Sequence, residues 1–262
     1  MENFEMKKKF GQNFLRDKNL LSAIVKDANI TENDTVVEIG PGAGALTEQI
    51  AKVAKRVIAF EIDTELEPIL KENLKEYSNI EIRFSDILKV DLNQLEDEIG
   101  EFKVVANLPY YITTPIIFAL LENCKKLKSL TIMVQKEVAE KIVASPKDKN
   151  YGVLSVMSSF YAKTQIMRIV GRQMFHPVPK VDSAIVRYEI KQFDQEFAKN
   201  VKKIVFSSFN MRRKTLANNL SSSFSLSREE VNQKIENAGL NPLSRAETLG
   251  VEDFVKLTKQ FY

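Results

Sequence analysis

A strand, a glycine-rich turn and a helix follow one another near the start of this chain, and this order limits the possible folds more than any other feature. The apolar run TVVEI leads into the turn GPGAG at residues 40–44, and the helix-like run ALTEQIAKVA follows. Glycine accepts backbone conformations that other residues avoid, so the main chain can pass close to a bound nucleoside here. Open α/β sheets bind ligands at the carboxyl ends of their strands, which is where Glu38 and the turn lie. We therefore predict an α/β fold with a nucleoside site at this turn.

The next two strand-like runs also end in acidic residues. RVIAFEID contains Glu61, which lies 21 positions after Gly40, and an acid at this place can hold both hydroxyls of a ribose. The run IEIRF leads into Ser85 and Asp86, whose carboxylate could accept a hydrogen bond from an adenine amino group. The two acids are therefore predicted to bind the two ends of an adenosine.

The strand-like run KVVA ends in the tetrapeptide NLPY, residues 107–110. This tetrapeptide suits the methylation of an exocyclic amine such as adenine N6, whose lone pair is tied up in the aromatic ring. The Asn107 amide oxygen and the Leu108 carbonyl could accept its two N–H bonds, so that the lone pair turns toward an electrophile. Tyr110 could stack on the ring. The structural alternative is an apolar strand that ends in an Asn-Leu-Pro turn, with Tyr110 packed on the core.

The glycine turn also satisfies the pattern G-x-G-x-x-A through Gly40, Gly42 and Ala45, which is typical of nicotinamide dehydrogenases. The acid after the second strand does not separate the two classes, because both cofactors carry a ribose diol. Asp86 and NLPY do separate them, since a dehydrogenase needs neither an adenine clamp nor an amine acceptor at those strand ends. The combination favours a methyltransferase.

Nine segments occur in this order: KKKFGQNFLRD, EIGPGAGALT, FEID, SDIL, NLPYYITTPIIF, MVQKEVAEKI, YGVLSV, FHPVPKVDSAIV and FNMRRKTLANNL. With them the chain resembles the ribosomal RNA adenine dimethyltransferases over nearly its whole length, and in particular the KsgA/RsmA type that acts on small-subunit rRNA. The resemblance implies a Rossmann-like class I methyltransferase sheet with helices on both faces and a small C-terminal helical domain. It also implies S-adenosylmethionine as cofactor and, as substrate, two adjacent adenosines in a loop near the 3′ end of 16S rRNA, each converted to N6,N6-dimethyladenosine.

The same resemblance assigns site residues. Those expected to bind S-adenosylmethionine are Gln12, Asn13, Leu15, Gly40, Gly42, Glu61, Ile62, Asp86, Ile87 and Asn107. Those expected around the target adenine are Asn107, Leu108, Pro109, Tyr110 and Phe175, with Tyr110 and Phe175 on its two faces. We expect direct in-line transfer without a covalent enzyme intermediate, since the methyl group already sits on a positively charged sulfur. The adenosine must be splayed out of paired or stacked RNA.

Three positions depart from the family pattern or attract attention within it. Ser85 stands where a glycine is usual before Asp86, and Ala217 follows KTL where the family often has arginine, which puts one basic RNA contact in doubt. His176, the only histidine, lies in the FHPVPKVDS segment and is interpreted as a loop residue rather than a catalyst.

Two other functions stay open. A sister family dimethylates 23S rRNA of the large subunit and confers macrolide resistance, but TTPII after NLPYY and the FNMRRKTL segment favour the small-subunit type. A ribosome-assembly or nucleic-acid-binding factor could keep the fold without catalysis. The presence of Glu61, Asp86, Asn107 and Tyr110 argues against a loss of activity.

Hydrophobic periodicity changes along the chain. Strand candidates SLTIMVQ, TQIMRIV and AIVRYEI alternate with the helical stretches KEVAEKIVA and YGVLSVMSSFYA, which predicts a mostly parallel sheet with helices on both faces. The PVPKV loop would then approach NLPY from the far side of the sheet. Near the N-terminus, Asp17 can cap a helix. After Lys191 only helical segments remain: AKNVKKIVFSSFN, SREEVNQKIENAG and VEDFVKLTKQF. We predict a methyltransferase domain at 1–193 and a small helical domain at 194–262.

Basic residues concentrate in this second segment. Residues 1–195 carry 27 lysines and arginines against 28 acids, whereas residues 196–262 carry 11 against 7. Apolar residues recur four apart at Phe197, Val201, Val205 and Phe209, and Arg212 breaks the pattern, so we expect the helix to end near Asn210. The basic residues opposite this apolar face are Lys199, Lys202, Lys203, Arg213 and Lys214. We favour an RNA-facing surface over an ordinary solvated face.

Composition excludes several classes. One cysteine and one histidine exclude a disulfide framework and a zinc site of the usual ligand count, so no metal is expected. Apolar runs such as TPIIFALL are too short to span a bilayer. Acids among the first lysines fit neither a secretory signal nor a transit peptide. We expect a cytoplasmic monomer without membrane contact that acts on the pre-30S particle.

Overall fold

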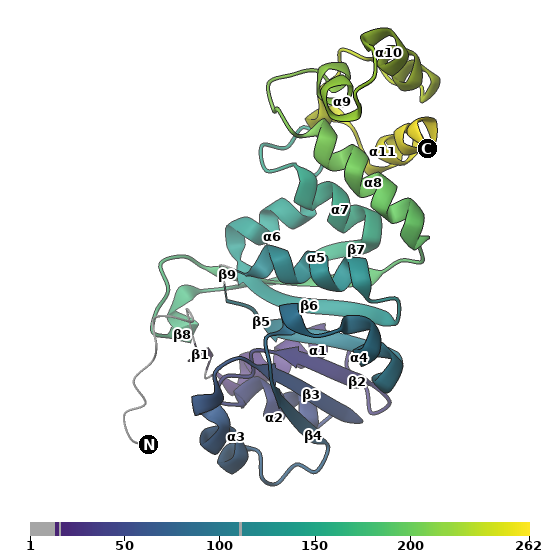
Figure 1. Ribbon diagram of the computed structural model, residues 1–262. Helices are drawn as coiled ribbons and strands as arrows, with labels where there is room; N and C mark the ends of the chain where they lie inside the picture. Colours follow the sequence, from purple (N-terminus) through teal and green to yellow (C-terminus); the bar gives the residue numbers. More distant parts are fainter. Residues whose placement is uncertain (1–13, 16, 110–111) are drawn as a thin grey trace. The chain divides into compact units, whose positions relative to one another are not determined.

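The computed structural model describes residues 14–15, 17–109 and 112–262 (Figure 1). Gln12, Asn13 and Tyr110 lie outside the described residues. The chain divides into two compact units, the first formed by Met1–Ala139 and Gln165–Ile190 and the second by Glu140–Thr164 and Lys191–Tyr262.

A seven-stranded sheet forms the centre of the first unit within the described part of the chain. Its strand order is β4-β3-β2-β5-β6-β9-β7. The pairs β2–β3, β2–β5, β3–β4 and β5–β6 are parallel, and β6–β9 is antiparallel. The strands are β2 (Thr35–Ile39), β3 (Arg56–Glu61), β4 (Ile80–Phe84), β5 (Phe102–Asn107), β6 (Leu127–Gln135), β7 (Ala162–Val170) and β9 (Ser183–Ile190). The predicted mostly parallel α/β sheet is confirmed.

Helices cover both faces of this sheet, with α1 and α2 together on one face and α4 and α5 on the other (Figure 1). The central strands are apolar on both sides for this reason, and Val36, Val57 and Val104 are completely buried. The Asp17 side chain accepts a hydrogen bond from Leu20 N at 2.8 Å and caps α1, as predicted. The helices are α1 (Lys18–Asp27), α2 (Ala45–Ala51), α3 (Glu67–Asn73), α4 (Leu92–Ile99), α5 (Thr113–Asn123) and α6 (Lys136–Val143).

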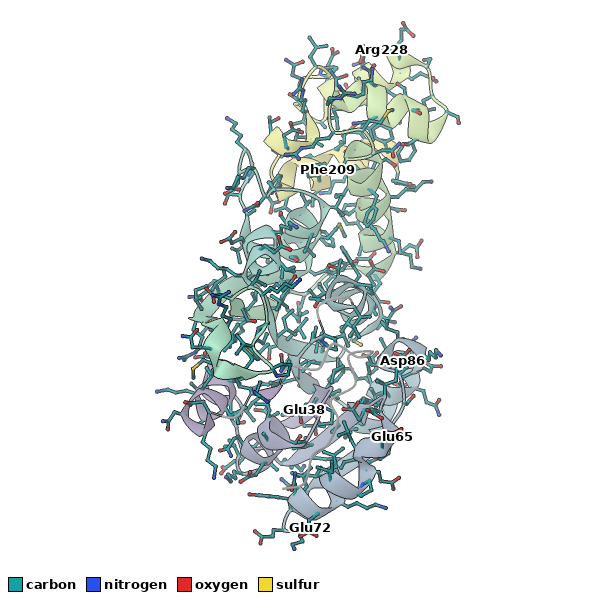
Figure 2. All side chains as sticks on the ribbon, turned by 90° about the vertical axis from the view of Figure 1, so that its left-hand side faces the viewer. Glu38, Glu65, Glu72, Asp86, Phe209 and Arg228 are labelled. Carbon is teal, nitrogen blue, oxygen red and sulfur yellow. The ribbon has the colours of Figure 1, made fainter. Side chains whose placement is uncertain are left out.

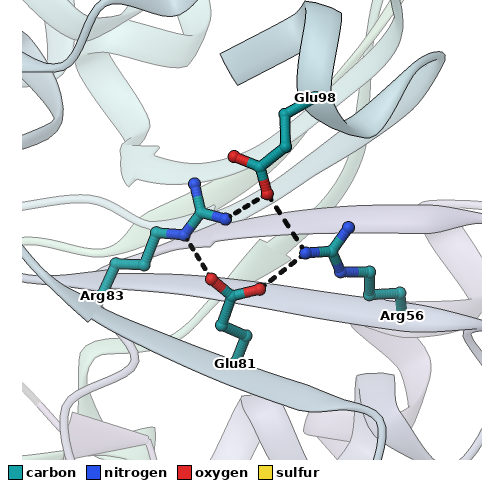
Figure 3. A network of polar contacts seen from close by, with 4 residues as sticks. All are labelled: Arg56, Glu81, Arg83 and Glu98. Atoms are coloured by element: carbon teal, nitrogen blue, oxygen red, sulfur yellow. Dashed lines mark hydrogen bonds and ion pairs between the residues drawn. The ribbon is translucent and has the colours of Figure 1, made fainter. Parts of the chain in front are cut away.

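A network of four charged side chains joins the edge strand β4 to β3 and α4 (Figure 3). Arg56 of β3 contacts Glu81 at 2.6 Å and Glu98 of α4 at 3.3 Å. Arg83 contacts the same two carboxylates at 2.6 and 2.5 Å, and these bonds raise the pKa of Arg83 and lower that of Glu81. Charges along an edge strand hinder pairing with another chain, so the network has a structural explanation.

The second unit is helical and contains α7 (Val153–Tyr161), α8 (Gln195–Ser208), α9 (Leu216–Phe224), α10 (Arg228–Asn237) and α11 (Val251–Phe261). Helix α7 packs on α8 and α11, which is why the unit includes residues 140–164 as well as the segment predicted from the change of period. Helix α8 ends at Ser208, close to the predicted end at Asn210. The division at 193 as a functional boundary stays a prediction.

Two parts of the fold were not predicted. Helix α9 contains two asparagines and three serines in its short sequence, and its N-terminus is capped by Thr215, whose side chain accepts from Asn218 N. Strands β1 (Phe14–Leu15) and β8 (Phe175–His176) form a separate antiparallel pair of two residues each, which is too short to show a period. Within the described residues, no helix has the length and apolar character needed to cross a membrane.

Candidate active site

Four of the predicted site residues, Gly40, Glu61, Asp86 and Asn107, lie at one edge of the sheet, where the parallel strands end. Ile39 of β2 pairs with Phe60 on one side and Ala106 on the other, so Gly40, Glu61 and Asn107 follow adjacent strand ends. Gly40 N donates to Phe60 O at 2.9 Å. A methyl group on Cα of Gly40 would lie 3.9 Å from the carbonyl oxygen of Asn107. The glycine turn and the NLPY segment are therefore direct neighbours, as predicted.

The turn requires its glycines. Gly40, Gly42 and Gly44 have φ angles of 73°, 58° and 86°, in the left-handed region that other residues enter with strain. Side chains are excluded at these places, and the backbone of the turn stays open to a ligand. Gly44 then leads into α2, whose Leu46, Thr47 and Ile50 are buried.

Glu61 is fixed by the backbone around it. Its Oε1 accepts from Ile62 N and Asp63 N, both at 2.9 Å, and its Oε2 accepts from Gly42 N at 3.1 Å. The side chain is 4% exposed, and burial raises its pKa although the three N–H groups oppose this. A carboxylate offers about four acceptor positions, so one stays available to a ligand hydroxyl. Ile62 beside it is 50% exposed and presents an apolar surface.

Glu38 is a second buried acid at the turn, and sequence reasoning noted its place without giving it a role. It is 1% exposed, and its Oε2 has no hydrogen-bond partner. Figure 2 labels Glu38. Burial raises its pKa to about 8; the nearby Thr47 hydroxyl lowers the pKa, and the charge of Glu61 raises it further. The buried Thr47 Oγ1 likewise has no hydrogen-bond partner. Burial thus favours the neutral form of Glu38, whereas the carboxylate of Glu61 is stabilised by three backbone N–H groups.

Asp86 follows β4 and begins a short 3-10 helix, Ile87–Lys89, by accepting from Leu88 N at 3.0 Å. Its side chain is half-buried, whereas Ile87 is buried. Strand β4 lies beside β3, with Phe84 paired to Glu61, so Asp86 belongs to the same edge of the sheet as Glu61 (Figure 2 labels Asp86).

The NLPY segment leaves β5 at Asn107, which pairs with Met133 of β6. Leu108 is buried and donates from its N–H to Met133 O at 3.3 Å. The Pro109 carbonyl accepts from Ile112 N at 3.2 Å and from Thr113 Oγ1 at 3.1 Å, which ties the segment to the start of α5. Asn107 thus lies at the end of β5, between the β5–β6 pairing and the hydrogen-bonded backbone of Leu108 and Pro109.

Leu15 and Phe175 are brought together by the small sheet, in which they are paired residues of β1 and β8. Both are buried, at 6% and 3% exposure, in one cluster that includes Met133 and Ile185. In this state the Phe175 ring is covered, and an adenine can reach it only after its neighbours move. The stacking role of Phe175 stays a prediction.

The loop after His176 lies at the same edge. Ser183 starts β9 opposite Gln135, the last residue of β6, so residues 177–182 lie where the parallel strands end. Lys136 N donates to Asp182 O at 3.0 Å. The PVPKV loop therefore lies at the sheet edge that carries NLPY, and its approach to NLPY stays a prediction. His176 is exposed.

Known proteins match this chain over nearly its whole length. The family described as Ribosomal RNA adenine dimethylase matches residues 3–261. A protein of Clostridium botulinum (strain Loch Maree / Type A3), Ribosomal RNA small subunit methyltransferase A, is 47% identical over 262 residues, covering 99% of this chain and 95% of its own. The protein of the same name from Clostridium acetobutylicum is 43% identical over 263 residues, with the same two coverages.

Two solved structures share the fold. A dimethyladenosine transferase from Plasmodium falciparum has a TM-score of 0.79 at 27% identity and covers 93% of this chain and 95% of its own. The 23S rRNA methyltransferase ErmE has a TM-score of 0.72 at 28% identity and covers 95% of this chain and 99% of its own.

Proposed function

The chain belongs to the ribosomal RNA adenine dimethylase family, and we propose that it transfers methyl groups from S-adenosylmethionine to N6 of two adjacent adenosines near the 3′ end of 16S rRNA. The observation that carries this proposal is the adjacency of the glycine turn and NLPY: a methyl group on Cα of Gly40 would lie 3.9 Å from the carbonyl oxygen of Asn107. A nucleoside held at the turn would lie beside an amine acceptor.

The residues of the turn fit S-adenosylmethionine. The left-handed glycines leave the main chain open, and the remaining acceptor position of Glu61 can take a ribose hydroxyl. Asp86 at the neighbouring strand end would accept from the adenine amino group, with Ile62 and Ile87 as apolar contacts. When bound, this cofactor supplies a methyl group on a positively charged sulfur. Gln12, Asn13 and Leu15 complete the proposed set from the N-terminal arm.

Asn107 would orient the target amine. Its amide oxygen and the Leu108 carbonyl would accept the two N6 hydrogens, which favours the tetrahedral nitrogen of the transition state over the planar ground state. The rigid attachment of the segment to Met133 and Thr113 keeps these acceptors in place. Proximity and orientation supply most of the rate, and the proton leaves to water after transfer. Tyr110 and Phe175 would hold the ring plane.

The small-subunit substrate is favoured over the large-subunit one by the degree of similarity. Identity is 47% to the small-subunit methyltransferase of Clostridium botulinum and 28% to the 23S rRNA methyltransferase ErmE. The proposal includes the pre-30S particle as substrate, a monomeric enzyme in the cytoplasm, and rRNA contacts by the exposed Arg213 and Lys214 after α8. A non-catalytic assembly role is the remaining alternative.

The decisive experiment is incubation with labelled S-adenosylmethionine and under-methylated small subunits, with large subunits in parallel, followed by mapping of the modified bases. We expect two adjacent N6,N6-dimethyladenosines near the 3′ end of 16S rRNA. Preferential methylation of 23S rRNA would transfer the assignment to the macrolide-resistance type. A folded protein that binds small subunits but transfers no methyl group would support the assembly role.

A further inference from the structure

Two exposed loops of the second unit lie side by side. The first, here the proline-lysine loop, is residues 145–150 between α6 and α7; the second, here the arginine loop, is residues 210–214 between α8 and α9. The rings of Tyr151 and Phe209, which directly adjoin the two loops, are 6.3 Å apart at an angle of 62°. Arg212 Nη2 also donates to Lys149 O at 3.5 Å. The two loops are therefore joined by the packing of these two rings and by this hydrogen bond, and they lie on one side of the unit.

The proline-lysine loop is a tight turn with an unusual residue at its centre. Asp148 N donates to Ser145 O at 3.0 Å, which closes a four-residue turn with Pro146 and Lys147 in the middle. Lys147 has a φ of 73°. Proline followed by a residue of positive φ is the pattern of a type II turn, and its third position strongly prefers glycine. A lysine therefore occupies a position whose backbone conformation favours glycine.

Contacts with another part of the second unit hold this conformation. Lys147 N donates to Glu247 O at 2.8 Å, and the buried Tyr151 hydroxyl donates to Leu249 O at 2.7 Å. Asn150 N donates to Asp148 Oδ1 at 2.8 Å. Every one of these bonds uses backbone or neighbouring side chains and none needs the Lys147 ammonium. Strained residues that the surrounding structure stabilises are often functional, and here the charged side chain is the part without a structural use.

A single buried side chain fixes the arginine loop. Asn219 of α9 is 1% exposed, and its Nδ2 donates to Ser208 O at 2.7 Å and to Met211 O at 3.2 Å. Its Oδ1 accepts from Met211 N at 3.1 Å. Lys214 N donates to Met211 O at 2.9 Å and closes the loop. The basic side chains that follow Met211 are all exposed and start from an ordered backbone.

The charges of this surface are available to an anion. The second unit carries 16 lysines and arginines against 10 acids, so its net charge is +6. Five of the cations belong to the two loops: Lys147, Lys149, Arg212, Arg213 and Lys214. Where the structure describes the chain, Lys147, Lys149, Arg213 and Lys214 make no ion pair. Asp148 is the only acid within the loops, and it already accepts Asn150 N.

We propose that the proline-lysine loop and the arginine loop form one surface that binds the phosphate backbone of rRNA, with Lys147 and Lys149 acting beside Arg213 and Lys214. The inference rests on the proposed function and adds the proline-lysine loop to its substrate-binding surface. Clustered, unpaired cations on ordered loops suit a polyanion, because each phosphate that they neutralise releases a counterion. Pre-ordered loops also lose little conformational entropy on binding.

Lys147→Gly is a specific test because stability and binding should change in opposite directions. Glycine relieves the left-handed strain, so the variant should unfold at the same or a higher urea concentration than wild type. Its binding to under-methylated small subunits should weaken. If one phosphate contact is lost, the wild-type advantage should shrink about 3.5-fold between 50 and 200 mM salt, since each contact contributes a slope of about 0.9. Asparagine also tolerates a positive φ, so Lys147→Asn should show the same two effects as Lys147→Gly.

The matched control is Lys259→Ala, which removes one exposed charge from α11 of the same unit and should leave binding unchanged. Wild-type affinity and salt slope in both Lys147 variants would overturn the proposal. Weaker binding to intact subunits with unchanged binding to protein-free 16S rRNA would assign the loop to a ribosomal protein and would overturn the RNA assignment. Failure of the proposed function is distinguishable, because wild-type enzyme would then not methylate small subunits at all.

Discussion

Replacement of Glu38 by glutamine should change how the stability of the protein depends on pH. The carboxyl is 1% exposed, its Oε2 has no partner, and burial raises its pKa from 4.5 to about 8. Between these two pH values the unfolded chain releases the proton while the folded protein keeps it. The folded state then binds more protons than the unfolded state, so the free energy of unfolding falls as the pH rises.

The size of this effect follows from the same two values. Each pH unit changes the free energy of unfolding by about 1.4 kcal/mol, which gives about 5 kcal/mol between pH 4.5 and about 8. Below pH 4.5 both states are protonated and the contribution vanishes. Glutamine cannot ionise, so Glu38→Gln should match wild type near pH 4.5 and exceed its stability by roughly 3 kcal/mol at pH 7.

Urea unfolding, followed by far-ultraviolet circular dichroism at pH 5, 6, 7 and 8, measures the difference. The control is Glu81→Gln, because its ion pairs with Arg83 and Arg56 lower the pKa of Glu81 (Figure 3). That pKa shift gives the opposite sign: wild type should be the more stable protein above pH 4.5, and its advantage should disappear as the pH falls. Parallel pH profiles for wild type and Glu38→Gln would refute the reasoning and would mean that Glu38 is ionised in the folded protein.

Three further predictions follow from the proposed function. Glu61→Ala should weaken S-adenosylmethionine binding about tenfold or more in calorimetry, because the acceptor for a ribose hydroxyl is lost. Equal affinity in a folded variant would show that Glu61 does not contact the cofactor. Asn107→Ala should lower kcat about 10²- to 10³-fold with little change in subunit binding, and wild-type turnover would disprove its role as amine acceptor. Replacing Arg213 and Lys214 together by alanine should flatten the salt dependence of subunit binding and leave cofactor affinity intact. An unchanged slope of affinity against salt would mean that the two side chains do not contact rRNA phosphates.

The sequence predicted the active-site edge well because its determinants are local. A strand, a glycine turn and an acid are each visible in a few consecutive residues, and parallel pairing places consecutive strand ends together. Gly40, Glu61 and Asn107 therefore meet as expected. The helix after Asp17 was predictable for the same reason, since its cap and its apolar face both lie within a dozen residues.

Features that depend on distant contacts were not predictable. The burial of Glu38 Oε2 without a partner depends on the packing of α2 against the sheet, which no periodicity shows. The positive φ of Lys147 depends on a hydrogen bond to Glu247, far along the chain. The pairing of Leu15 with Phe175 joins two very short strands from opposite parts of the sequence. Helix α9 has weak intrinsic propensity and depends on its tertiary contacts with α8 and α10.

Charged residues in this protein illustrate how structural and functional uses can be separated. In the network around Arg56 and Arg83 every carboxylate has its cation, and the arrangement is explained by the protection of a sheet edge (Figure 3). Glu38 and Lys147 differ, because one is an acid buried with an unpartnered oxygen and the other is a lysine in a conformation that favours glycine. Local chemistry opposes both choices, and each adjoins a surface that the proposed reaction uses: Glu38 the cofactor turn and Lys147 the rRNA loops. Under the proposed function, a requirement of the reaction outweighs local stability at both positions, which the Glu38 and Lys147 variants test.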